Sequence, residues 1–218
     1  MEKVKKIIRW IKEHRYCLAG LYLFVFLLGF YLLERFGPEP QWMVYSVIDG
    51  WIPFNEWFVL LYFLWYLWVP AFMIYFMLRD KKAYLMLCLT MFTGATLCLL
   101  IYLIWPNGLE LRQEITGNNF CAEIVRLLRS IDPPRNVCPS IHVSSTVAIH
   151  LVICRSAIFS KNRKIKLLSW AVTLGISVST LLIKQHSIID VLCGWGLSVV
   201  LGILAIWGNK WRKVWSYQ

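Results

Sequence analysis

Apolar runs of about 20 residues follow one another along almost the whole length of this 218-residue chain. A helix needs about 20 predominantly apolar residues to cross the hydrocarbon core of a bilayer. Inside that core the backbone polar groups must be hydrogen-bonded within the protein, which favours helices. With 59% hydrophobic residues, the composition also excludes an ordinary soluble globular domain. We therefore expect an all-α, polytopic membrane protein in which residues 1–218 form a single membrane domain.

The apolar runs predict a bundle of six transmembrane helices. The second run covers about 22 residues, or about 33 Å as a helix, which is enough to cross a bilayer with modest tilt. The predicted spans are residues 17–33, 57–78, 83–105, 141–159, 166–185 and 188–208. Ahead of them, residues 1–16 combine six basic residues with apolar residues at helical spacing. This segment predicts a basic amphipathic helix on an anionic membrane face or, alternatively, a disordered basic tail.

Lys and Arg are distributed unevenly between the two sides of the predicted bundle. If the N-terminus is cytoplasmic, 17 of the 23 basic residues fall in cytoplasmic segments. Because cytoplasmic loops carry an excess of Lys and Arg, this distribution predicts that both termini are cytoplasmic. Topology then accounts for most of the formal net charge of +11, and we expect no nucleic-acid partner.

The longest polar segment, residues 106–140, is then an extracytoplasmic loop. It contains apolar residues at helical spacing, which predict a short helix resting on the bilayer surface and covering a site below. The residues of this apolar face are Phe120, Ile124, Leu127, Leu128 and Ile131. Two of the seven cysteines, Cys121 and Cys138, share the loop. A disulfide between them is possible, although nothing in their spacing requires it.

A polar stretch, Lys184–Asp190, interrupts an otherwise apolar region from residue 167 to residue 207. Ionisable groups at the edge of a bilayer cost free energy, so their presence there suggests a functional site. If the stretch is helical, His186 and Asp190 lie at positions i and i+4, where the carboxylate can orient the imidazole. The alternative interpretation is a solvated kink between two helices.

A second histidine, His142, lies at the start of the predicted fourth span. It follows Pro139 and Ser140, which suit the first turn and the cap of a helix, and free backbone N–H groups there can bind an anion. The turn near Lys164 is about 22 residues from both His142 and His186, so a constant rise per residue brings both histidines to the same depth.

These residues suit the chemistry of a phosphate ester. An imidazole oriented by a carboxylate can attack phosphorus, and a second histidine can protonate the departing oxygen. Arg112, just past the third span, and a helix N-terminus can stabilise the charge on the phosphoryl oxygens. This route needs no metal or other cofactor. Two alternatives use the same residues: a metal triad of His142, His186 and Asp190, or a non-catalytic membrane scaffold.

The same residues resemble motifs of the type 2 phosphatidic acid phosphatase superfamily. The segment Pro139–His142 is similar to the second motif, Pro-Ser-Gly-His. Ser179, His186 and Asp190 are similar to the third motif, Ser-Arg-x5-His-x3-Asp. The first motif, Lys-x6-Arg-Pro, is matched only by Arg112.

The resemblance covers roughly residues 100–200 and implies a six-span bundle with its active site at the outer face, in a catalytic core of about residues 106–195. It implies that His186 is the nucleophile that forms a phosphohistidine, that Asp190 orients it and that His142 is the general acid. It also implies that Ser140 and Arg112 hold the phosphate.

The chain departs from these motifs at four positions, so that two phosphate-binding cations are missing. The residues at these positions are Trp105, Gln113, Ile141 and Thr180. Lys184 and Arg135 are candidates to replace the missing cations, although Lys184 can instead snorkel towards the membrane surface. In lacking the arginine of the third motif, the chain is more similar to the lipid phosphotransferase branch of the superfamily. That branch includes sphingomyelin and inositol phosphorylceramide synthases.

We therefore expect an integral membrane lipid phosphatase that hydrolyses a phosphate ester or diphosphate of a lipid through a phosphohistidine. We expect it in a bacterial plasma membrane, with the active site facing outward. A phosphotransferase that passes a lipid head group to an alcohol acceptor remains the closest alternative.

Overall fold

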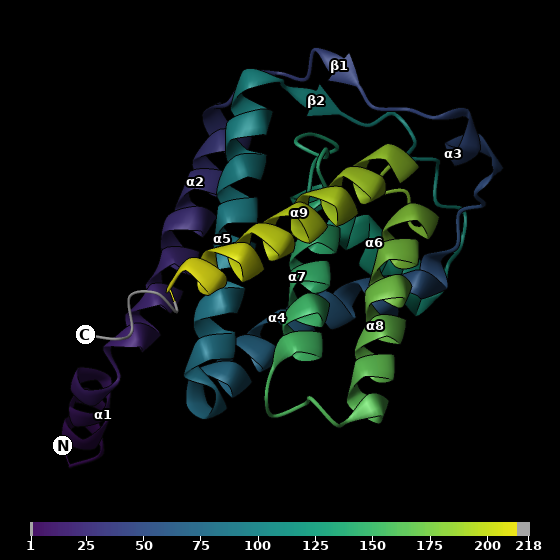
Figure 1. The fold of residues 1–218 in the computed structure, drawn as a ribbon. Coiled ribbons are helices and arrows are strands. Elements are labelled where there is room, and N and C mark those ends of the chain that lie inside the picture. The colour runs from purple at the N-terminus through teal and green to yellow at the C-terminus, as the bar shows by residue number, and fades with distance from the viewer. Residues whose placement is uncertain (1, 213–218) are drawn as a thin grey trace.

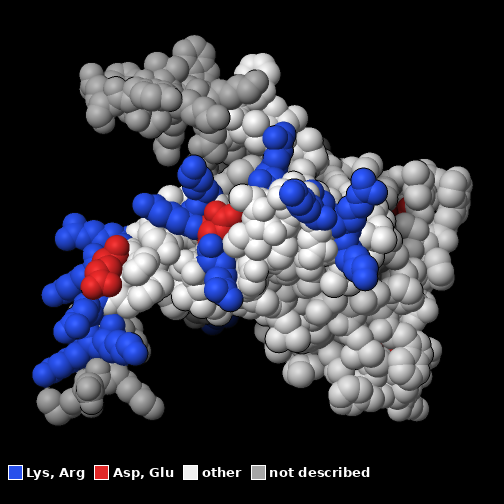
Figure 2. Space-filling model, turned by 60° about the horizontal axis from the view of Figure 1, so that its bottom comes forward, with Lys and Arg blue, Asp and Glu red and all other residues white. Residues whose placement is uncertain are grey.

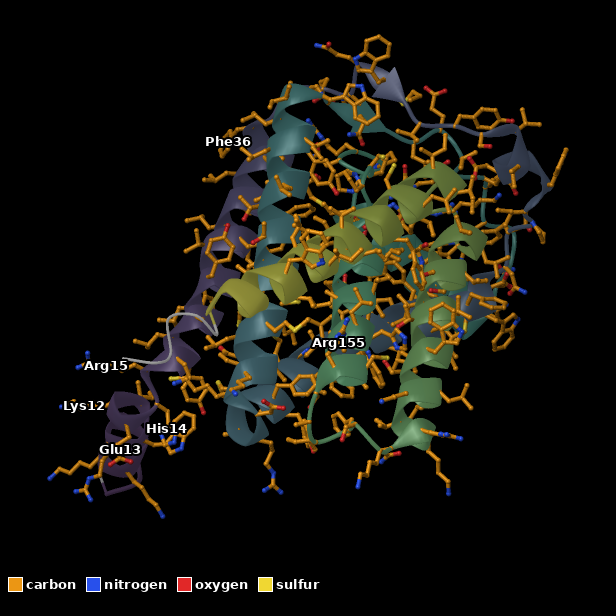
Figure 3. All side chains as sticks on the ribbon, viewed as in Figure 1. Lys12, Glu13, His14, Arg15, Phe36 and Arg155 are labelled. Carbon is orange, nitrogen blue, oxygen red and sulfur yellow. The ribbon has the colours of Figure 1, made fainter. Side chains whose placement is uncertain are left out.

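The computed structural model describes residues 2–212, of which most are helical, with 74% helix and 2% strand in all. Five helices are long and apolar enough to cross a membrane, which confirms the expectation of an all-α membrane protein. They are Arg15–Phe36 (η1, Arg15–Leu21, and α2, Tyr22–Phe36), Glu56–Arg79 (η2, Glu56–Phe58, and α4, Val59–Arg79), α5 (Lys81–Ile104), α8 (Arg163–Leu182) and α9 (Ile188–Arg212). In Figure 3, Arg15 and Phe36 mark the two ends of the first of these.

The predicted fourth span, residues 141–159, is a shorter helix than expected. This helix, α7, runs from Ile141 to Arg155 and has 15 residues, or about 22 Å, against a hydrocarbon core of about 30 Å. It lies in the middle of the bundle and packs against α4, α5, α8 and α9 (Figure 1). Because nearly all its side chains from residue 143 to residue 153 contact protein, its length need not match the thickness of the bilayer. By length and composition, five helices among residues 2–212 could span a membrane, and a sixth span stays a prediction.

The α4–α5 and α7–α8 turns meet at one end of the bundle. The Ser156 hydroxyl donates to Asp80 Oδ2 at 2.9 Å, and Asp80 also caps α5 by accepting from Ala83 N at 3.0 Å. The space-filling view in Figure 2 shows many Lys and Arg side chains on this face. The two turns and their flanks carry Arg79, Lys81, Lys82, Arg155, Lys161, Arg163, Lys164 and Lys166. The N-terminal helix α1 (Glu2–Glu13), which the spacing of residues 1–16 predicts, projects from this end (Figure 1).

Short elements cover the opposite end of the bundle. Strand β1 (Trp42–Met43) pairs in parallel with β2 (Asn107–Gly108), beside the short helix α3 (Val47–Trp51) and the loop helix α6 (Phe120–Ile131). The predicted apolar face of α6 is only partly buried: Leu128 packs against Val59 and Ile183, whereas Phe120, Leu127 and Ile131 are exposed.

Cys121 and Cys138 do not form a disulfide. Both thiols are free and buried, and they belong to different apolar clusters. Cys121 packs with Val59 and Val125, and Cys138 packs with Val44 and Leu109. Each therefore acts as a small apolar side chain.

Candidate active site

A tight turn at the end of α8 starts the polar stretch. Lys184 N donates to Leu181 O at 3.1 Å, and Gln185 N donates to Thr180 O at 2.9 Å, which is the Schellman pattern. Lys184 occupies the left-handed position of this turn, with φ at 57°. The turn reverses the direction of the chain before His186, so the polar residues after Ile183 leave the helix.

A capping box starts α9. Ser187 N donates to Asp190 Oδ2 at 2.8 Å, and Ile189 N donates to Ser187 Oγ at 3.2 Å. His186 therefore lies just before α9, with Asp190 in the first turn of that helix. The expected pair at positions i and i+4 does form, although the capping box, and not a continuous helix, brings the two side chains together.

His186 and Asp190 make a buried pair. His186 Nδ1 lies 3.2 Å from Asp190 Oδ2, and the two residues are 7% and 0% exposed. Because an ionised carboxylate only accepts hydrogen bonds, the pairing favours the tautomer in which Nδ1 carries the hydrogen. The ring nitrogen that remains available is then Nε2.

His142 lies beside this pair, on the first turn of α7. Its ring centroid is 5.8 Å from that of His186, 4.4 Å from that of Trp65 and 4.6 Å from that of Tyr62. Its Nε2 is buried and has no hydrogen-bond partner among the described residues. The two histidines are therefore close, but not for the expected reason: α7 has 15 residues and α8 has 20, so the arms of the hairpin are unequal, and Lys164 lies within α8 rather than at the centre of the turn. Aromatic faces next to His142 can stabilise positive charge on its ring.

Both histidines line a cavity of about 480 Å³. One part of its wall is polar and includes Gln185, Asp132 and Asn136. Another part comes from the apolar face of α2 and consists of Phe26, Leu27, Phe30 and Tyr31. The cavity therefore offers a polar region at the histidines and an apolar wall that leads away from them.

Ser140 joins α7 to α9 rather than lining this cavity. Its backbone N–H donates to Asp190 O at 3.1 Å, and its hydroxyl caps α7 by accepting from Val143 N at 3.4 Å. The residue is fully buried. Ser140 thus holds α7, which carries His142, against α9, which carries Asp190. This structural role differs from the direct phosphate contact that we expected for Ser140.

Arg112 lies behind the cavity wall. Its Nη2 donates to Asp132 O at 2.7 Å and to Gln185 Oε1 at 2.5 Å, and it is not among the residues that line the cavity. Burial lowers the pKa of Arg112 from its ordinary value, while the nearby Asp132 carboxylate raises it. Arg112 therefore does not line the cavity, which differs from the expected direct phosphate contact.

Arg135 lines the cavity, but much of its guanidinium is already bonded. It donates to the backbone oxygens of Gly37 and Pro38 at 3.1 and 2.7 Å, and it pairs with Glu39 at 3.3 Å. Its main contacts thus hold residues 37–39 in place.

Lys184 points away from the cavity, which corrects both the expected phosphate contact and the snorkelling alternative. Its Nζ donates to the backbone oxygens of Asp49 and Ile52 at 2.8 and 2.5 Å, and the residue is 2% exposed. Burial lowers the pKa of this amine, against a smaller opposing effect of Asp49. Its role in this structure is to join α3 to the turn after α8.

Asp49, which the sequence analysis did not single out, completes that junction. Its carboxylate accepts from Ser187 Oγ at 2.6 Å and from the N–H groups of Ile188 and Ser46, each at 2.8 Å. A capping-box pattern, Ser46-x-x-Asp49, is visible in the sequence and indicates the start of α3. Nothing local indicates that the same carboxylate also caps α9.

Lys184→Met is expected to lower the free energy of unfolding by about 2–4 kcal/mol, because it leaves two buried carbonyl groups without a donor. The KM of the protein that remains folded should stay close to that of the wild type. Thermal unfolding in detergent and steady-state kinetics measure the two effects. Lys166→Met is the matched control, because its exposed ammonium also donates to a backbone oxygen, that of Ser160. A raised KM at unchanged stability would instead show that Lys184 binds substrate.

Among residues 2–212, no group of three His, Cys, Asp or Glu side chains is arranged to hold a metal ion. The Asp190 carboxylate faces His186 Nδ1 and Ser187 N, and Asp190 is not part of the cavity wall. The arrangement therefore does not support the alternative of a metal triad made by His142, His186 and Asp190.

Comparison with known proteins adds no relative. No protein-family model matches the sequence, and no curated protein is significantly similar to it. The resemblance to the phosphatase motifs therefore rests on the individual residues of the sequence.

Proposed function

We propose that this chain is an integral membrane enzyme that breaks a phosphate ester of a lipid through a covalent intermediate on His186. The observation that carries the proposal is that His186, which pairs with the buried Asp190, lines a cavity together with His142. A carboxylate-oriented imidazole beside a second imidazole can supply a nucleophile and a general acid. The apolar wall from α2 suits the hydrocarbon part of a lipid.

In the first step, the lone pair on His186 Nε2 attacks phosphorus, and the bond from phosphorus to the ester oxygen breaks. His142, in its protonated form, gives its proton to that oxygen, so the lipid leaves as an alcohol. Asp190 stabilises the positive charge that develops on the His186 ring. The negative charge of the arriving phosphate favours the protonated form of His142.

In the second step, a water molecule attacks the phosphohistidine. His142 takes the proton of the water, the bond from phosphorus to Nε2 breaks, and inorganic phosphate leaves. His186 and His142 then return to their starting forms. Because His142 gives one proton to the leaving alcohol and regains one from the attacking water, the two steps balance without a metal or redox cofactor.

The proposed topology has six spans, with the short buried helix α7 as the fourth. The basic turns at residues 79–82 and 155–166 favour a cytoplasmic position for that end of the bundle and for α1. The site then lies at the outer side of the membrane, and we propose that this membrane is the plasma membrane of a bacterium. Residues 210–218, which contribute to the charge count at the C-terminus, lie partly outside the described residues.

A lipid phosphotransferase is the second candidate. Thr180, at the position of the third-motif arginine, is fully buried, and its hydroxyl donates to Ser177 O at 2.7 Å. Glu34 and Asp132 line the cavity, so the wall mixes acidic with basic side chains. This mixed charge suits an acceptor that carries hydroxyl groups, and the reaction would then replace water by an alcohol in the second step.

The test is phosphate release by detergent-purified protein from a panel of lipid phosphates, with a chelator present, beside His186→Ala. Release by the wild type that is lost in the variant supports the proposal and names the substrate. If no lipid releases phosphate, the same panel with added lipid alcohols tests the transfer reaction. Absence of both activities in correctly folded protein would reject an enzyme of phosphate esters.

A further inference from the structure

Gln185 is a buried polar residue on the cavity wall that the catalytic cycle above does not use. It directly precedes His186 and is 3% exposed. Its Oε1 accepts from Arg112 Nη2 at 2.5 Å, whereas its Nε2 is buried and has no hydrogen-bond partner among the described residues. One half of the amide is therefore held in place, and the other half is available.

The contact with Arg112 determines which way the amide faces. A guanidinium can only donate hydrogen bonds, so the amide atom next to it must be the oxygen. The NH₂ group must then be on the other side, and an exchange of the two amide atoms would place two donors against each other. The orientation of the Gln185 amide therefore follows from chemistry.

A buried donor without a partner costs free energy, and such groups are rare unless a ligand uses them. Two residues that line the cavity beside His186 carry such nitrogens, Gln185 Nε2 and His142 Nε2. Both can bond oxygen atoms. A phosphoryl group positioned for attack by His186 carries such oxygens and requires donors as charge spreads over them.

We propose that Gln185 Nε2 donates to a non-bridging oxygen of the substrate's phosphoryl group, in the role that a directly bound arginine would otherwise fill. This inference rests on the proposed function. Arg112 acts through Gln185 as a positioning residue: it fixes the amide and supplies positive charge from behind it. The site thus binds phosphate through a neutral donor that a buried cation orients.

Gln185→Glu separates this role from a structural one. The new carboxylate keeps the shape of the side chain and can form an ion pair with Arg112, so the melting temperature should not fall. The variant has no amide donor and carries a negative charge next to the phosphoryl group. We expect kcat/KM to fall by about 10- to 100-fold, and the inhibition constant of orthovanadate to rise by a similar factor.

Gln113→Glu is the matched control, because it makes the same change of charge at an exposed position of the loop. Its kcat/KM and its inhibition constant should stay within about twofold of the wild type. If Gln185→Glu also behaves like the wild type in both measurements, the inference is wrong, and the proposed function stands.

Measurements on the wild type alone test the proposed function separately from the role of Gln185. If the wild type turns over no lipid phosphate and orthovanadate does not raise its melting temperature, neither the reaction nor the phosphate site exists. If orthovanadate raises the melting temperature of the wild type but not that of Gln185→Glu, the phosphate contact is supported even in the absence of turnover.

Discussion

His186→Ala is expected to lower turnover of the lipid substrate by about a thousandfold or more, the largest kinetic effect that this site predicts. Alanine removes the nucleophile, and no described histidine other than His142 lies close enough to replace it. The variant should lose some stability but remain folded, because Ser187 N still donates to the buried Asp190 carboxylate after the imidazole is removed. Initial rates of protein that elutes normally in size-exclusion chromatography measure the effect.

A covalent intermediate provides the sharper readout of the same variant. Quenching the wild type with alkali during turnover of a radiolabelled substrate should leave label on the protein, because phosphohistidine survives alkali and is lost in acid. His186→Ala should retain none. The matched control is His150→Ala, which removes a histidine two turns further along α7 that bonds Ser169 Oγ at 3.1 Å. Label on His186→Ala would assign the nucleophile to another residue.

His142 should behave differently from His186 in the same experiment. Its removal takes away the general acid, which contributes about 100- to 10,000-fold with an alcohol as the leaving group. An aryl phosphate with an acidic leaving group needs little protonation, so His142→Ala should regain much of its first-step rate with that substrate. No such recovery is expected for His186→Ala, because a good leaving group does not replace a nucleophile.

The two histidines meet, but the equal spacing from which their common depth was predicted is wrong: the turn between α7 and α8 lies at residues 156–162, nearer in the sequence to His142 than to His186. The rise per residue of a helix is constant, and a short turn between α7 and α8 makes their arms antiparallel. Because α8 has 20 residues and α7 has 15, helical rise alone does not bring His142 and His186 to the same depth. The lateral packing of α7 could not be predicted for a different reason. Hydropathy does not distinguish a helix surrounded by protein from one surrounded by lipid.

The directions of Lys184, Arg112 and Gln185 could not be predicted for another reason. They depend on the left-handed turn at Lys184 and on contacts with Asp49 and Asp132, which are far away in the sequence. A lysine is not the usual residue for a left-handed turn, which glycine favours. The capping pattern Ser187-x-x-Asp190 was the one local indication that His186 precedes a helix, and a search for helix starts would have found it.

Gly194→Ala is expected to cause a large loss of both stability and activity, because α7 and α9 touch at this residue. A Cβ atom at Gly194 would lie 2.8 Å from Ser140 O, 3.2 Å from Val143 Cβ and 3.3 Å from Ser144 N. Two of these atoms belong to the backbone and cannot rotate away. Overpacking of this kind costs about 1–3 kcal/mol, more than the roughly 1 kcal/mol that alanine gains over glycine in a helix.

The same displacement should reach the active site. Ser140 precedes His142 by two residues and bonds Asp190 O, so a shift of α9 away from α7 changes the spacing between the two histidines. Since a misplacement of about 1 Å can cost about 100-fold in rate, turnover should fall in the Gly194→Ala protein that remains folded.

Gly196→Ala tests whether packing causes these effects. Gly196 lies two residues further along the same helix, and a Cβ there would meet no atom of the described residues within 4 Å. Alanine at this position should raise the melting temperature or leave it unchanged, because only its helix propensity counts. Equal losses in the two variants would show that α9 needs glycine for its backbone rather than for contact with α7. A loss confined to Gly194→Ala would establish that this contact sets the distance between His142 and His186.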